Sequence, residues 1–115
     1  MNNTMILVTK SGLGTVSPDD TAFGVDMLDK FFHTLERLPE KPAVICFYTE
    51  GVKCVAEGSP FVLGLKLLES LGSQVVSCLT CLNYYGIEDQ LAVGQARGMP
   101  DILRLMTEAN KVITI

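Results

Sequence analysis

A chain of 115 residues, 48% of them apolar and 19% charged, suits a single folded domain and is too apolar for an intrinsically disordered protein. Nine Lys and Arg against thirteen Asp and Glu give a net charge of −4 without any basic run, so no nucleic-acid partner is expected. No apolar run approaches the roughly 18 residues that span a bilayer, and the first residues lack the pattern of a signal peptide, which predicts a cytoplasmic protein with no membrane partner.

The first part of the chain predicts a strand, a helix and a second strand. Thr4 to Thr9 (TMILVT) is short, apolar and partly β-branched, as buried strands are. Ser17 and Pro18 then form a typical helix start, an N-cap serine followed by proline. The helix reaches to about Pro39 with one apolar face, made of Leu28, Phe31, Phe32, Leu35 and Leu38. Ala43 to Tyr48 (AVICFY) is a second buried strand.

The rest of the chain continues this alternation of helices and strands. Ser59-Pro60 repeats the helix start, and Gln74 to Ser77 (QVVS) predicts a third strand that runs directly into a pair of cysteines. After a short helical stretch, Leu91 to Gly94 predicts a brief fourth strand. A last helix opens at Pro100, and Lys111 to Ile115 (KVITI) predicts a fifth strand.

Strands that alternate with helices are typical of a parallel sheet covered by helices. The sequence therefore predicts an α/β fold with three layers, α/β/α, and a five-stranded, mainly parallel sheet within one domain, residues 1–115. In such sheets ligands bind where the carboxyl ends of the strands meet. Four segments are expected at that edge, namely Lys10 to Gly14, Thr49 to Cys54, Cys78 to Cys81 and Gly94 to Arg97.

The four cysteines are the main functional signal, since a cytoplasmic protein rarely uses them as structural disulfides. Cys78 ends a predicted strand, and Cys81 lies in the first turn of the segment that follows. Backbone N–H groups at such a turn stabilise a thiolate, which is the form that attacks a sulfur donor. Cys78 and Cys81 are therefore the candidate catalytic residues, although free cysteines are also common as small core residues.

Other uses of these thiols are weaker. A zinc site is not expected, because Cys46 and Cys54 do not form a second CxxC pair and His33 lies within a helix. A thioredoxin-like dithiol would follow an early strand, and a cysteine protease would need a base close to the thiol. Cys46 lies inside a strand and is expected in the core. No metal or cofactor is expected.

The loop from Gly12 to Asp20 (GLGTVSPDD) resembles the phosphate-binding loop of a flavodoxin-like protein, but it has neither a GxGxxG pattern nor a Walker lysine. Two acidic residues within it would also repel a phosphate. A turn followed by a helix cap is the better interpretation of this loop.

Several segments together resemble the DsrE-like family over essentially the whole chain. Phe47 to Val52 (FYTEGV) is similar to the end of that family's second strand, and Cys78 resembles its persulfide-carrying cysteine, with Gly86-Ile87 as the downstream glycine–aliphatic pair. A narrower resemblance is to the carboxyl-terminal domain of YedF-type selenium-metabolism or sulfurtransferase-like proteins. It is carried by EGSP, CLTCLNYYG and AVG, which start at Glu57, Cys78 and Ala92.

The resemblance implies a three-layer DsrEFH-like fold and a sulfurtransferase-like sulfur relay. Cys78 would carry a persulfide, with Cys81 as its resolving neighbour, and the partner would be a sulfur-carrier protein of the TusA/SirA-like type. It also implies a homo-oligomer, in which Tyr84, Tyr85 and Met99 are candidates for the subunit interface. YedF-type proteins normally carry an additional amino-terminal sulfur-carrier domain that is not present in this sequence, so the chain would be either a stand-alone member or a fragment of a longer protein.

A second hypothesis from another class stays open. The chain would then be an oligomeric binding or regulatory module whose thiols are structural and which transfers nothing. A buried and slowly reacting Cys78 would favour that alternative.

Overall fold

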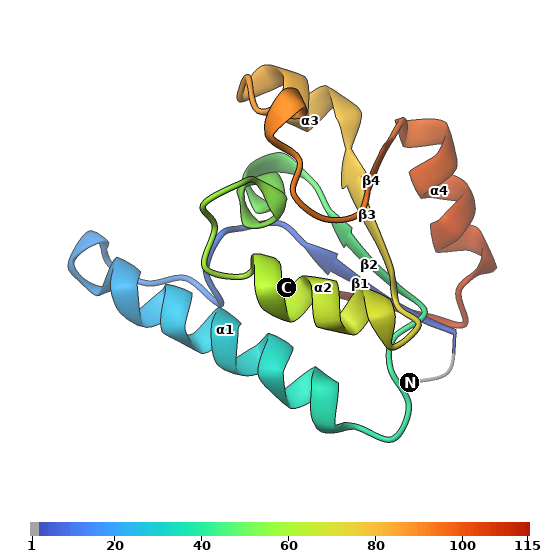
Figure 1. The fold of residues 1–115 in the computed structure, drawn as a ribbon, viewed down its shortest axis with the longest axis horizontal. Helices are drawn as coiled ribbons and strands as arrows, with labels where there is room; N and C mark the ends of the chain where they lie inside the picture. Colours follow the sequence, from blue (N-terminus) through green and yellow to red (C-terminus); the bar gives the residue numbers. More distant parts are fainter. Residues whose placement is uncertain (1–2) are drawn as a thin grey trace.

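Five strands are found in residues 3–115, the part of the chain that the computed structural model describes, and all of them pair in parallel (Figure 1). The absence of a signal peptide was predicted partly from residues 1 and 2, which lie outside the described residues. The strands are β1 (Thr4–Val8), β2 (Val44–Phe47), β3 (Gln74–Cys78), β4 (Gln95–Arg97) and β5 (Lys111–Thr114). Their order across the sheet is β4-β3-β2-β1-β5.

Helices connect successive strands and cover both faces of the sheet. The α-helices are α1 (Thr21–Arg37), α2 (Val62–Ser70), α3 (Leu79–Tyr84) and α4 (Met99–Glu108), and three short 3₁₀ helices are η1 (Pro18–Asp20), η2 (Thr49–Val55) and η3 (Glu88–Gln90). The predicted α/β fold with a five-stranded parallel sheet is therefore confirmed. No helix within residues 3–115 is long and apolar enough to cross a membrane.

The register of the strands sorts their side chains onto two faces. Neighbours in a parallel pair share a face, so Leu7 on β1, Cys46 on β2 and Val76 on β3 form one row across the sheet. Ile6 and Ile45, one position earlier on their strands, point to the opposite face. Both rows are buried, which is why the strands read as continuous apolar runs in the sequence.

Different helices cover the two faces (Figure 1). One face packs against α1 and α2, through buried residues such as Phe32 and Leu65. The other packs against α4, whose Ile102 is fully buried against the row that contains Cys46. The helix between β4 and β5 is thus the one that covers the face on which two of the cysteines lie, Cys46 and Cys78.

The prediction of a fourth strand at Leu91 to Gly94 is wrong, because β4 is formed by Gln95–Arg97. Leu91 pairs instead with Ala56 in an isolated antiparallel bridge, and Val93 is buried in the core as part of a loop. Gly94 then turns the chain at φ +77°, with its α-carbon so close to β3 that a Cβ would lie 2.5 Å from the Val75 carbonyl oxygen. The apolar residues of this segment therefore pack in the core as a loop, whereas the strand that follows is short, mostly polar and at the edge of the sheet.

The segment after β2 is more ordered than the sequence suggests. It was expected only as a stretch leaving the strand, but η2 spans Thr49–Val55 and buries four of its residues, Gly51, Val52, Cys54 and Val55. Gly51 is required here, because a Cβ on it would lie 2.1 Å from the Val8 carbonyl oxygen at the end of β1. This close approach fixes η2 against the carboxyl edge of the sheet.

Candidate functional site

The end of β3 places both candidate thiols at the carboxyl edge of the sheet. Cys78 is the last residue of β3 and the N-cap residue of α3, and it pairs with Arg97 on β4. Cys81 lies in the first turn of α3. Because α3 has only six residues, the acidity of each thiol depends on its individual neighbours rather than on a helix dipole.

Cys78 belongs to the core on the α4 side of the sheet. Alternation along β3 puts it on the same face as Val76, and the residue is 1% exposed. Solvent therefore does not reach Cys78 directly in this structure. The sequence argument placed this residue correctly at the strand end, but it could not tell that the side chain turns inward.

Cys81 is the more accessible of the two thiols. It is partly exposed, and its Sγ accepts a hydrogen bond from the backbone N–H of Thr49, with a distance of 3.0 Å between the two atoms. Cys78 lies close enough to Cys81 for a side-chain interaction that raises the pKa of the Cys81 thiol. The structure thus brings together the two cysteines predicted from the sequence and adds a backbone donor from η2.

Burial, Cys78, through both a side-chain hydrogen bond and its charge, and the backbone N–H of Thr49 together set the pKa of Cys81. Partial burial raises its pKa the most, and the hydrogen bond with Cys78 raises it further. The Thr49 N–H lowers the pKa, because a donor stabilises the thiolate more than the thiol. The raising influences prevail, so the pKa of Cys81 lies above its usual value, and the Thr49 N–H is the contact that opposes this rise and favours the reactive thiolate.

The other two cysteines have environments that suppress reactivity. Burial raises the pKa of Cys46 to about 12, with the charges of Cys78 and Cys81 as further causes. Burial, and secondarily the charge of Glu50, raises the pKa of Cys54 to about 12. Cys54 Sγ donates to the Lys10 carbonyl oxygen at 3.7 Å, a contact that favours the protonated thiol. Both are core residues, as was expected for Cys46.

The lysines near this edge of the sheet have partners of their own. The Lys10 ammonium group donates to the Gly14 carbonyl oxygen and to Thr15 Oγ1, at 3.2 and 3.1 Å. Lys53 lies over the ring of Tyr85, with Nζ 4.7 Å from the ring centre. The Lys10 contacts stabilise the loop after β1, and the Lys53 contact stabilises the position of Tyr85. The hydrogen bond to Cys81 comes instead from the backbone N–H of Thr49.

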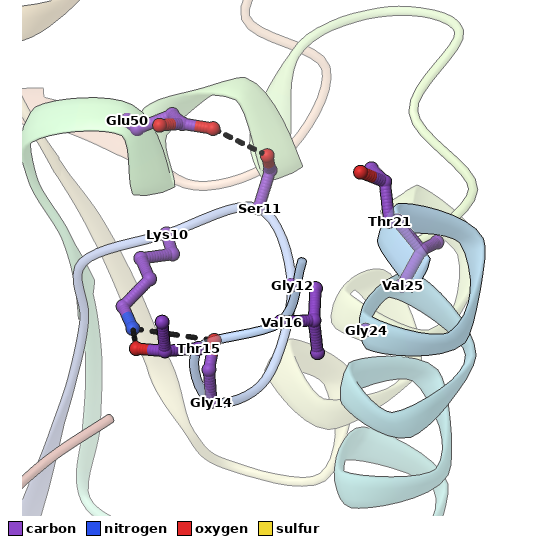
Figure 2. A pocket seen from close by; sticks show the side chains of 10 residues that line it. All are labelled: Lys10, Ser11, Gly12, Gly14, Thr15, Val16, Thr21, Gly24, Val25 and Glu50. Atoms are coloured by element: carbon purple, nitrogen blue, oxygen red, sulfur yellow. Dashed lines mark hydrogen bonds between the residues drawn. The ribbon is translucent and has the colours of Figure 1, made fainter. Parts of the chain in front are cut away.

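The Lys10 loop forms a small pocket between β1 and the start of α1 (Figure 2). Its volume is about 230 Å³, and Ser11 closes one side by donating to Glu50 Oε1 at 3.1 Å. Gly12 packs on the backbone of Gly24, where a Cβ would lie 3.2 Å from the carbonyl carbon. The loop is thus a tightly packed turn before a helix.

The zinc-site and cysteine-protease alternatives, which the sequence disfavours, would involve His33 or a cluster of metal ligands. His33 is an exposed residue of α1 that lies 3.4 Å from both Asp29 and Glu36, far along the chain from the thiols. Within residues 3–115, no group of three or more His, Cys, Asp or Glu side chains is placed to hold a metal ion.

The residues expected at a subunit interface differ in exposure. Tyr84 is 82% exposed and Met99 is half-exposed, whereas Tyr85 packs partly against the core.

Thr49, whose N–H donates to Cys81, is a residue of this candidate site that the sequence does not single out. Its segment was expected at the edge of the sheet, but no residue pattern signals that its N–H points at a sulfur. The useful signal was the Gly51 that follows, because a glycine just after a buried strand often marks a close approach of two backbone segments.

The comparisons with known proteins show the fold of this chain. No protein-family model matches it, and no curated protein does. Among solved structures it is similar to MTH1491, a protein of unknown function from Methanobacterium thermoautotrophicum, with 17% identity over 97% of both chains and a TM-score of 0.68. It is also similar to the ychN protein from E. coli, with 17% identity over 100% of both chains and a TM-score of 0.66.

A third similar structure is BT1422, a conserved protein of unknown function from Bacteroides thetaiotaomicron, with 17% identity over 99% of this chain and 96% of that one, and a TM-score of 0.64. The match over whole chains supports the three-layer α/β fold that the DsrE-like resemblance implies. At this level of identity, similarity extends to the fold and carries no information on activity.

Proposed function

We propose that this chain is a DsrE-like sulfur-relay protein that carries sulfur, and by the same chemistry selenium, as a persulfide on the Cys78–Cys81 pair. The observation that carries the proposal is the placement of both thiols at the carboxyl edge of the sheet, where the Thr49 N–H donates to the more exposed sulfur. The narrower similarity to YedF-type proteins, seen in the CLTCLNYYG segment, supports the same function.

Receipt of sulfur is a thiol exchange in which no net oxidation takes place. The Cys81 thiolate attacks the terminal sulfur of a donor persulfide, R–S–SH, and a new S–S bond forms on Cys81 while the S–S bond of the donor breaks. The donor leaves as the thiolate R–S⁻ and takes up a proton. Delivery is the same step with an acceptor thiolate as nucleophile and Cys81 as leaving group.

The two cysteines have different roles in this proposal. Exposure favours Cys81 as the thiol that first meets the donor, whereas the sequence named Cys78 as the acceptor. Cys78 is close enough to attack the inner sulfur of a Cys81 persulfide, which would form a Cys78–Cys81 disulfide and release hydrosulfide. A dithiol reductant would then be needed to restore the pair.

The burial of Cys78 favours the alternative, an oligomeric binding or regulatory module with structural thiols. In that case neither cysteine would accept sulfur. The exposed Tyr84 and Met99 would remain candidates for the interface of a homo-oligomer, because large apolar side chains are often covered by a second subunit. Light scattering at micromolar concentration distinguishes the assembly from a monomer.

The relay is tested by receipt and delivery together. The chain is incubated with a cysteine desulfurase and cysteine, purified, and mixed with a TusA/SirA-like sulfur carrier. We expect a mass increase of about 32 Da, one sulfur atom, that moves to the carrier. Cys81→Ser should abolish receipt, and Cys54→Ser is the matched control that should retain it. Failure of the wild-type chain to gain sulfur would favour the binding module.

A further inference from the structure

Thr49 has a backbone conformation that threonine rarely adopts. Its φ is +50°, in the left-handed region, where a β-branched side chain is strained. Strain of this kind persists only when surrounding contacts hold it, and it is most common at functional positions. The residue is the first of η2, directly after the strand β2 and Tyr48.

Neighbouring contacts hold Thr49 in this conformation. Its hydroxyl oxygen lies 3.0 Å from the Thr9 carbonyl oxygen and 2.7 Å from that of Tyr48, so one proton can be donated to either acceptor. The Tyr48 N–H donates to the Val8 carbonyl oxygen at 3.2 Å on one side of Thr49. On the other side, Gly51 packs directly on the same Val8 carbonyl group.

The consequence of this conformation is the direction of one N–H group. With its φ held positive, Thr49 presents its N–H to Cys81 Sγ at 3.0 Å. Cys78 at the end of β3 and Cys46 on β2 lie near enough to interact electrostatically with this thiol, and apolar residues of both core clusters pack against Cys81. The donor that stabilises negative charge on Cys81 therefore comes from a strained residue on another element.

We infer that Thr49 is a positioning residue for Cys81: its side-chain hydroxyl holds the left-handed backbone that aims the Thr49 N–H at the reactive sulfur. This inference rests on the proposed sulfur transfer for its biological meaning, but the geometry concerns the reactivity of the thiol alone. In transfer, the N–H stabilises Cys81 whenever it attacks or leaves as a thiolate.

The test compares substitutions that separate the hydroxyl from the backbone conformation. Thr49→Val keeps the shape but removes the hydroxyl, so the strained backbone should relax and turn its N–H away. Thr49→Ser keeps the hydroxyl, and Thr49→Gly adopts a positive φ without strain. The measurement is the iodoacetamide alkylation rate of Cys81 against pH, with the modified cysteine identified by peptide mass spectrometry.

We expect Thr49→Val to lower the Cys81 rate near neutral pH about tenfold, as loss of one hydrogen bond to a charged group predicts, and to move the pH profile upward. Thr49→Ser and Thr49→Gly should stay within about threefold of the wild-type rate. Equal rates in Thr49→Val and the wild type, or an equal loss in all three variants, would overturn the inference. Thr49→Ala replaces Thr49→Val should the latter fail to fold.

Circular dichroism and continued protection of Cys46 and Cys54 show that each variant is folded. The sulfur-loading experiment separates this inference from the proposed function. If the wild-type chain takes up no sulfur while Thr49→Val still slows alkylation, the positioning role stands and the relay fails. If sulfur loads normally in every variant and alkylation is unchanged, the relay stands and the positioning role fails.

Discussion

Thr49 and Cys54, near the two ends of η2, take part in hydrogen bonds of opposite polarity at a cysteine sulfur. At one end the Thr49 N–H donates to Cys81, and at the other Cys54 donates to the Lys10 carbonyl oxygen. A donor favours the thiolate, whereas an acceptor favours the thiol. The comparison teaches that closeness to the edge of the sheet does not by itself make a cysteine reactive, because burial is the largest influence on the pKa of both thiols and a backbone partner only modifies it.

The largest expected effect is the contrast in reactivity between these two thiols. At pH 8 we expect iodoacetamide to modify Cys81 at least about a hundredfold faster than Cys54, since Cys54 is both buried and held as a thiol. Peptide mapping of a time course measures both rates in one sample. Cys81→Ser should remove the fast thiol and Cys54→Ser should leave it; a fast phase that survives in Cys81→Ser would break the comparison.

Detaching η2 from the sheet is expected to affect stability strongly. Gly51→Ala would force a Cβ to within 2.1 Å of the Val8 carbonyl oxygen, so the backbones must separate at a cost of about 3 kcal/mol. Urea unfolding measures this change. Gly98→Ala is the matched control, because its Cβ would be 3.5 Å from the nearest atom, and it should cost less than about 1 kcal/mol. Similar costs for the two variants would show that η2 is loosely attached.

Alkaline pH should destabilise the fold through the two suppressed thiols. The pKa of Cys46 and of Cys54 is raised from 9.0 to about 12 on folding, so between these values the folded chain keeps protons that the unfolded chain releases. The free energy of unfolding therefore falls as pH rises from 9, by up to about 1.4 kcal/mol per pH unit for each thiol.

Urea unfolding at pH 7, 9 and 10 checks this dependence, with a Cys46→Ala/Cys54→Ala variant as the reference in which the decline should be shallower. Other groups that titrate at alkaline pH contribute equally to both proteins and cancel in the difference. Parallel curves for the two proteins would mean that these thiols are not the source of the dependence.

The smallest expected effect is electrostatic. The charge of Glu50 contributes to the raised pKa of Cys54, so Glu50→Gln should lower that pKa while leaving Cys81 unchanged. A pH titration of the cysteine Cβ carbon shifts by NMR follows both residues at once. A change in the pKa of Cys81, with the pKa of Cys54 unchanged, would contradict the conclusion that Glu50 acts on Cys54.

Sequence patterns that reflect burial were reliable guides to this fold. Buried strands such as β1 and β2 are continuous apolar runs because helices cover both faces of the sheet. Pro18 and Pro100 lie in the first turns of η1 and α4, as the preference of proline for helix starts predicts. The Ser17 side chain makes no capping hydrogen bond, and α2 begins at Val62 rather than at the predicted Ser59-Pro60. The position of β4 was predicted wrongly because this strand has only three residues, two of them polar, and lies at the edge of the sheet. Neither periodicity nor hydrophobicity therefore distinguishes it in the sequence.

The site could be predicted only in part. The CxxC spacing and the position of Cys78 at a strand end correctly predict that Cys78 and Cys81 lie at the carboxyl edge of the sheet. Which of the two sulfurs is exposed depends on how the chain passes from β3 into α3. The contact from Thr49 depends on a positive φ that no rule assigns to threonine. A contact between residues this far apart in the sequence can be recognised only in the folded structure.

The location of sulfur in the loaded wild-type chain tests the central claim most directly. The protein is exposed to a cysteine desulfurase and cysteine, its free thiols are blocked, and its peptides are mapped by mass spectrometry. We predict one added sulfur in the peptide that holds Cys78 and Cys81, assigned to Cys81, with Cys46 and Cys54 unmodified. Sulfur on Cys54, or no sulfur on either Cys78 or Cys81, would contradict the proposal that this pair carries the persulfide.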